Sequence, residues 1–174
     1  YELRALFADI RYPEHAAGVD EVIASLEYAT RLAKQDPNGK PVRFSERLKD
    51  EFARRNYVIL QMEKALRKDL FFLNIQPVYD IGQRRFTGGE VLLRLNEDSG
   101  MPIPPGEFIP IAIDNGIATE LGLMVMDKVC RFLQANGESD IGWLSVNVSS
   151  QQDEFDETVQ HLEMLLDHYG VAPE

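Results

Sequence analysis

Gly88-Gly89-Glu90-Val91-Leu92-Leu93-Arg94-Leu95 is an apolar run that follows a glycine pair and contains one acid and one base. Successive side chains of a strand point to opposite faces, so Glu90, Leu92 and Arg94 share one face. The residues between them share the other face. A run of this kind predicts a strand that is buried on both sides.

The two charged side chains of this strand each need a partner. A carboxylate and a guanidinium are costly to remove from water unless something compensates their charge. Four residues along a strand separate Glu90 and Arg94 by roughly 13 Å, which is too far for an ion pair. A metal ion for the acid and a phosphate for the base would satisfy both.

The composition of the whole chain is that of an ordinary globular protein. Its 174 residues are 44% hydrophobic and 27% charged, which suits one domain or parts of two. No apolar run approaches the ~20 residues that span a bilayer, and Cys130, the single cysteine, fits a reducing compartment. We expect a cytoplasmic location without membrane contact, either as a soluble protein or as the cytosolic part of a membrane-anchored parent. Tyr1 is not an initiator methionine, so we expect an excised piece of that parent.

The net charge of -11 is unevenly distributed along the sequence. Residues 1–83 hold 13 basic and 13 acidic side chains, whereas residues 84–174 hold 5 basic and 16 acidic ones. Such a surface disfavours DNA and RNA polymers, which need clustered Lys and Arg. It leaves open a small anionic ligand that is held through a metal ion.

The first part of the chain has the pattern of a small α/β fragment. Residues 3–12 predict a strand, residues 20–34 an amphipathic helix and residues 41–44 a short strand. A long helix is expected from Ser45 to Lys68, with apolar residues three and four apart. One interpretation, which we favour, is a connector helix packed on a neighbouring domain. The other is a helix that pairs with a second copy to form a homodimer.

The second part alternates strands and helices. Residues 70–81 and 86–96 predict two strands that a short turn joins into an antiparallel hairpin. A proline-rich loop follows at 102–106, and the next expected elements are helices at 105–115 and 118–135, a strand at 142–150 and a helix to Tyr169. This alternation predicts an α/β sheet or barrel, in which ligands gather at the carboxyl ends of strands.

The polar face of the second-half strands carries five side chains of interest: Gln76, Glu90, Arg94, Ser145 and Asn147. Carboxylate and amide oxygens are hard ligands that suit Mg²⁺ or Mn²⁺. Arg94 offers a fork for a phosphate group. A metal-phosphate site is one hypothesis; a structural role for each polar group is the other.

Residues 70–152 resemble the first part of an EAL domain, the bacterial phosphodiesterase that hydrolyses cyclic di-GMP to linear pGpG. The resemblance rests on several motifs in the family's order and at similar spacing: Gln76-Pro77, Gly89-Glu90-Val91-Leu92-Leu93-Arg94, Pro105-Gly106-Glu107-Phe108-Ile109-Pro110, Leu121-Gly122, and Leu144-Ser145-Val146-Asn147-Val148-Ser149 followed by Gln151 or Gln152.

The resemblance implies a partial TIM-like (β/α) barrel of EAL type with an antiparallel opening strand. It implies that Glu90 and Asn147 are metal ligands for Mg²⁺ or Mn²⁺, and that Glu90 is thereby catalytic. Arg94 would contact a substrate phosphate and Gln76 the dinucleotide. The implied reaction is in-line attack on phosphorus by a metal-activated water.

The sequence also departs from the family pattern. Val91 replaces the alanine of the signature, Ile75 a tyrosine, Leu95 a tryptophan and Ile113 an acid. The chain ends at Glu174, before the family's later acidic motifs, so we expect this segment by itself to be inactive. A degenerate module that senses cyclic di-GMP without cleaving it, and a dimerising scaffold, remain alternatives.

Residues 1–45 resemble, more loosely, the C-terminal tail of a GGDEF domain. The matching piece is Leu26-Glu27-Tyr28-Ala29-Thr30-Arg31-Leu32-Ala33-Lys34, followed by the Asn38-Gly39 turn and the strand at Phe44. The expected organisation is therefore a GGDEF-like remnant at 1–45, a connecting helix at 46–68 and the N-terminal part of an EAL domain at 69–174.

Overall fold

The computed structural model describes residues 7–36, 38, 40–137, 142–147 and 155–171. The chain divides into two compact units, Tyr1–Tyr57 and Val58–Glu174. The boundary falls inside one long helix, α2 (Glu46–Lys68), whose first half belongs to the first unit and whose second half belongs to the second.

The first unit is a strand, a helix and a strand, followed by the start of α2. Strands β1 (Ala8–Asp9) and β2 (Val42–Arg43) pair in parallel, and α1 (Val19–Gln35) connects them. Tyr28 and Ala29 of α1 pack with Phe44 and Leu48 in a small buried cluster. The expected α/β fragment is confirmed, although β1 is far shorter than the predicted strand because only two of its described residues find a partner.

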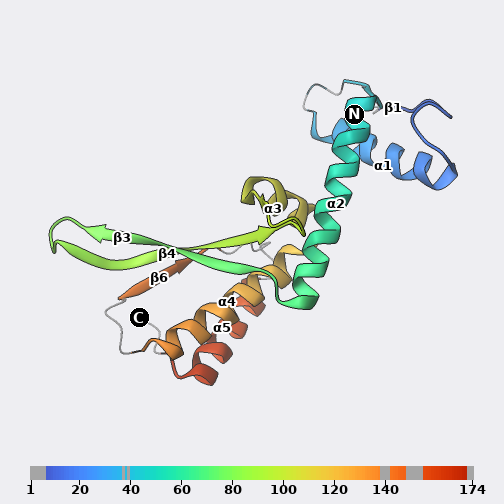
Figure 1. Ribbon diagram of the computed structural model, residues 1–174. Coiled ribbons are helices and arrows are strands. Elements are labelled where there is room, and N and C mark those ends of the chain that lie inside the picture. Colours follow the sequence, from blue (N-terminus) through green and yellow to red (C-terminus); the bar gives the residue numbers. More distant parts are fainter. Residues whose placement is uncertain (1–6, 37, 39, 138–141, 148–154, 172–174) are drawn as a thin grey trace, which may run out of the picture. The chain divides into compact units, whose positions relative to one another are not determined.

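The second unit is built on a mixed sheet of four strands (Figure 1). Strand β3 (Phe72–Asp80) runs antiparallel to β4 (Arg85–Asn96), which confirms the predicted hairpin. On its other side β4 pairs in parallel with β6 (Trp143–Val146). The strands described form an open sheet and do not close into a barrel, so the expected α/β class is confirmed at this coarser level.

One strand was not anticipated. Residues Pro102–Ile103 form β5, which pairs antiparallel with Leu95 and Asn96 at the end of β4, where the sequence predicted only a loop. A two-residue strand carries no alternation of polar and apolar residues, so no pattern in the sequence identifies it.

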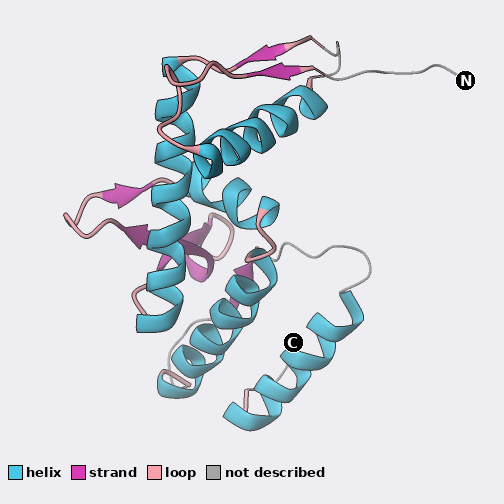
Figure 2. Cartoon of the chain, turned by 90° about the vertical axis from the view of Figure 1, so that its right-hand side faces the viewer, coloured by secondary structure: helices cyan, strands magenta, loops and turns pink. Residues whose placement is uncertain are grey.

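Three helices complete the second unit: α3 (Pro105–Asp114), α4 (Ala118–Ala135) and α5 (Phe155–Tyr169). Figure 2 shows α4 and α5 side by side. Gln134 of α4 donates to the carbonyl of Tyr169, and the hydroxyl of Tyr169 donates to Asp127 of α4. None of the helices in the described ranges combines the length and the apolar character needed to cross a membrane.

The glycine pair before Glu90 lets two strands approach β4 closely. A β-carbon on Gly88 would lie 2.4 Å from the carbonyl oxygen of Trp143 in β6. A β-carbon on Gly89 would lie 2.5 Å from the side chain of Ile75 in β3. Both distances are shorter than atoms tolerate, so only glycine allows these strands to pair here without displacement.

The helices cover one face of β4. Val91 packs with Val125 and Val129 of α4, and Leu95 lies in a larger cluster with Met62 and Phe108. Strand alternation therefore turns Glu90, Leu92 and Arg94 towards the opposite face.

The apolar residues that lie three and four apart on α2 pack inside the two units. Leu48 packs in the cluster of the first unit, and Met62, which is fully buried, packs in the second. Ile59 also contacts the second cluster. A dimer seam made of Ile59 and Met62 would therefore have to expose this core.

Candidate active site

The two expected metal ligands lie in direct contact. The side-chain amide of Asn147 donates a hydrogen bond to a carboxylate oxygen of Glu90, with 2.7 Å between nitrogen and oxygen. The parallel register explains this contact, because Glu90 lies opposite Ser145 and Asn147 follows two residues later on the same face. Residues 57 positions apart in sequence thus converge beyond the carboxyl end of β6.

Gln76 and Ser145 flank Glu90 in one row across the sheet. Gln76 lies opposite Glu90 in the antiparallel pair, and Ser145 lies opposite it in the parallel pair. Partners in register share a face, so three strands present a glutamine, a glutamate and a serine side by side. The side chain of Gln76 is exposed, whereas Glu90 is half-buried.

Arg94 lies on the same face, closer to the end of β4. Its guanidinium donates to the backbone carbonyl of Leu93 at 2.9 Å, and the residue is half-buried. Arg94 and Asn147 both line a pocket whose other walls include Ile109 of α3 and Gly122 of α4. The pocket lies beside the later residues of β4, between this strand and the helices α3 and α4, and Glu90 and Gln76 are not among its lining residues.

The residues present fit a divalent metal ion in part. Glu90 and Asn147 supply a carboxylate and an amide, and a half-turn of the amide would point its oxygen towards the carboxylate. Two hard oxygen donors suit Mg²⁺ or Mn²⁺, which take six or so ligands. In the described ranges no group of three or more His, Cys, Asp or Glu side chains surrounds a common point. The pair by itself would supply only some of the ligands that such an ion needs.

The departures from the family pattern lie away from this face. Val91 is 3% exposed and packs on α4, so its extra methyl groups fill the core behind the sheet. Ile75 lies opposite Val91 in the register and shares that face, and Leu95 is buried in the core. Ile113 is exposed on α3. The departures at Val91, Ile75 and Leu95 therefore leave the side chains on the face of Glu90 unchanged.

The structure adds one residue, Asn74, to the polar side chains on the face of Glu90. Asn74 of β3 lies opposite Leu92, so its exposed amide shares the face of Glu90, Gln76 and Arg94. The sequence held a signal for this position: Asn74 precedes Gln76 by two residues, and residues two apart in a strand share a face. The motifs did not include it, and only the register shows which residue of β4 it faces.

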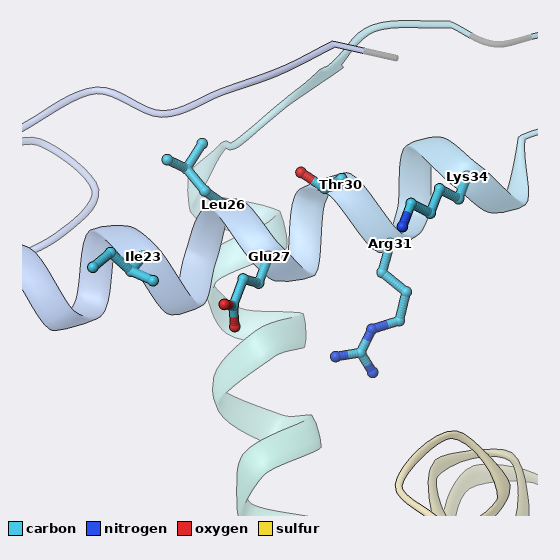
Figure 3. A pocket seen from close by; sticks show the side chains of 6 residues that line it. All are labelled: Ile23, Leu26, Glu27, Thr30, Arg31 and Lys34. Atoms are coloured by element: carbon cyan, nitrogen blue, oxygen red, sulfur yellow. The ribbon is translucent and has the colours of Figure 1, made fainter. Parts of the chain in front are cut away.

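A second hollow, on α1, does not resemble a binding site. Its six lining side chains come from successive turns of this single helix (Figure 3): Ile23, Leu26, Glu27, Thr30, Arg31 and Lys34. Side chains from one helix face border an open surface, so nothing here converges on a ligand as Glu90 and Asn147 do.

Comparison with known proteins agrees with the fold. A family model described as EAL domain matches residues 60–174. The signaling protein YkoW of Bacillus subtilis (strain 168) is 29% identical over 116 residues, which cover 65% of this chain and 14% of that protein. The cyclic di-GMP phosphodiesterase PdeF of Escherichia coli (strain K12) is 26% identical over 114 residues, or 66% of this chain and 14% of that protein.

Comparison with solved structures gives the same fold. The crystal structure of the FimX EAL domain from Pseudomonas aeruginosa bound to c-di-GMP matches with a TM-score of 0.57 and 28% identity, covering 67% of this chain and 47% of that one. The chain thus spans about half the length of that structure and a small part of the curated relatives. On the family match over residues 60–174, the chain belongs to the EAL domain family.

Proposed function

We propose that this chain is part of a bacterial signalling protein whose complete EAL domain binds cyclic di-GMP and hydrolyses it to linear pGpG with Mg²⁺ or Mn²⁺. The observation that carries the proposal is the contact between Glu90 and Asn147. The similarity to a cyclic di-GMP phosphodiesterase and to an EAL structure bound to c-di-GMP supports the same substrate.

Each residue of the site has a distinct role in this proposal. Glu90 and Asn147 hold the divalent ion, which when bound supplies the Lewis acid that activates water. Arg94 offers two parallel N–H groups to a phosphate of the substrate and fixes its orientation. Gln76 contacts the dinucleotide from the neighbouring strand. Arg94 and Asn147 line one pocket, which supports a phosphate position close to Asn147.

Substitution of Glu90 tests this proposal. In the full-length protein, Glu90→Gln keeps the shape of the side chain and removes its charge, so we expect the loss of most metal-dependent pGpG release, measured by chromatography. Glu163→Gln on the exposed surface of α5 is the matched control and should retain activity. Unchanged turnover by Glu90→Gln would contradict the assigned role.

A non-catalytic receptor is the second candidate. Ile75 and Ile113, which replace a tyrosine and an acid of the family pattern, keep it open. The same protein preparation separates the candidates, because a receptor binds cyclic di-GMP in calorimetry and releases no pGpG. A dimerising scaffold, in which α2 or the EAL domain forms a homodimer, predicts neither binding nor turnover and a dimer in sedimentation.

The upstream organisation also remains a proposal. The family match begins at residue 60, so it gives no support to a GGDEF-like remnant at 1–45. We retain that assignment, with the connecting helix at 46–68 and the EAL part at 69–174, as the division that the motifs favour.

A further inference from the structure

We propose that Asn74 of β3 is a further substrate-contact residue, whose side-chain amide donates to the phosphodiester held between Glu90 and Arg94. The inference rests on the proposed function, because it names one more contact to the same cyclic dinucleotide. It comes from the register of the sheet.

The position of the phosphate follows from the two charged residues of β4. Glu90 and Arg94 lie on either side of Leu92 on one face of the strand. In this proposal a phosphate that reaches both the metal at Glu90 and the fork of Arg94 lies above Leu92, between Asn147 on the side of β6 and Asn74 on the side of β3. Asn74 is the residue opposite Leu92 in β3. Directly opposite side chains of an antiparallel pair start about 4.5 to 5.5 Å apart, so the amide reaches the same space.

The local chemistry of Asn74 fits a ligand contact better than a structural role. Asparagine is disfavoured in strands, and a residue that breaks a local rule needs a compensating reason. The side chain of Asn74 is exposed, so its amide faces solvent above the sheet. Its NH₂ group is therefore available for a phosphate oxygen. It also lies closer than Gln76 to the end of β4 that carries Arg94.

The charge of the site makes the proposal testable with isosteric variants. Asn74→Leu removes the donor and keeps the branched shape, and leucine favours the strand more than asparagine does. Asn74→Asp keeps the shape but places a negative charge beside the phosphate. A hydrogen bond to a charged group is strong, so we expect Asn74→Leu to weaken cyclic di-GMP binding by roughly tenfold. Asn74→Asp should weaken it further.

The experiment measures the dissociation constant of cyclic di-GMP by calorimetry, and kcat and KM for pGpG release, in the full-length protein. Asn56→Ala, which removes an exposed amide from α2, is the matched control and should bind as the unaltered protein does. A contact to the bound phosphate raises KM more than it lowers kcat, and the melting temperature without ligand stays unchanged in Asn74→Leu. A structural role would instead lower that melting temperature in Asn74→Leu and leave KM unchanged.

The outcomes distinguish this inference from the proposed function. If the unaltered protein binds cyclic di-GMP and both Asn74 variants bind equally well, the contact is wrong and the proposed function stands. If the unaltered protein does not bind cyclic di-GMP, both the Asn74 contact and the proposed function are wrong. Weaker binding in the order Leu then Asp supports the contact.

Discussion

At the scale of single residues, Glu90 and Arg94 each form a hydrogen bond with a neutral partner. Glu90 accepts from the amide of Asn147, and Arg94 donates to the carbonyl of Leu93. In the part of the chain that the structure describes, neither forms an ion pair. Neutral partners reduce the cost of desolvation but leave each charge free to act on a ligand. The pair is therefore suited to a cation and an anion.

The contact between Glu90 and Asn147 leads to a prediction about metal binding. Asn147→Asp places two carboxylates in contact, and two like charges about 4 Å apart at a protein surface repel by about 1 to 4 kcal/mol. We expect a lower melting temperature for this variant without metal, and a larger rise in melting temperature on adding Mn²⁺ than the unaltered protein shows. Differential scanning calorimetry with and without Mn²⁺ measures both.

The control for this experiment is Asn136→Asp at the end of α4, outside the site. Its melting temperature should not respond to Mn²⁺ more than that of the unaltered protein. An equal response of Asn147→Asp and the unaltered protein would show that position 147 does not take part in metal binding.

At the scale of elements, β4 organises the second unit because it pairs with three other strands. Its glycine pair makes this possible, since a side chain at Gly88 would collide with the backbone of β6 and one at Gly89 with a side chain of β3. The helix on its other face supplies the core, and the hairpin supplies Gln76. The site depends on the registers of β3 and β6 against this one strand.

Substitution of Gly88 tests the close approach of β6. We expect Gly88→Ala to lower the free energy of unfolding by about 1 to 3 kcal/mol, because the backbone of Trp143 must move away. Urea denaturation measures the change. Gly106→Ala is the matched control: nothing lies within 4 Å of its added carbon, and it lies in α3, so stability should stay the same or increase. A neutral Gly88→Ala would contradict the geometry.

At the scale of the whole molecule, the chain has separate cores in its two units. Phe44 is buried in the first, whereas Cys130 and Val129 are buried on α4 in the second. Burial raises the pKa of the Cys130 thiol, and the nearby Asp127 raises it further. The thiolate is the reactive form, so Cys130 should react with thiol reagents only when the second unit opens.

Labelling of Cys130 tests whether the two cores are independent. Phe44→Ala should destabilise the first unit by about 3 to 5 kcal/mol. We expect it to leave the labelling rate of Cys130 unchanged, whereas Val129→Ala, beside the cysteine, should raise that rate. If both variants accelerate labelling equally, α2 couples the units into one cooperative structure.

Sequence reasoning found the hairpin and the helices because each leaves a local signal, whereas the roles proposed for Gln76, Glu90, Arg94 and Asn147 came from the family resemblance. The hairpin has two alternating runs around a short turn, and the helices have apolar residues three and four apart. It missed β5, whose two residues have no period, and the position of Asn74 opposite Leu92. Both depend on which residue of another strand lies opposite, and that is not a local property.

The sequence by itself determined that Glu90 and Arg94 share one face of a strand and that the amide of Asn147 follows on a later polar face. The predicted burial of this strand on both sides is wrong, because Val91 and Leu95 are buried whereas Glu90 and Arg94 are only half-buried. Only the tertiary structure decided that Asn147 touches Glu90, that Asn74 faces Leu92, and that the apolar stripe of α2 is consumed by two cores. Side-chain alternation follows from backbone geometry within one strand. Register between strands depends instead on packing and close approach, such as that at Gly88 and Gly89, and those involve residues far apart in the chain.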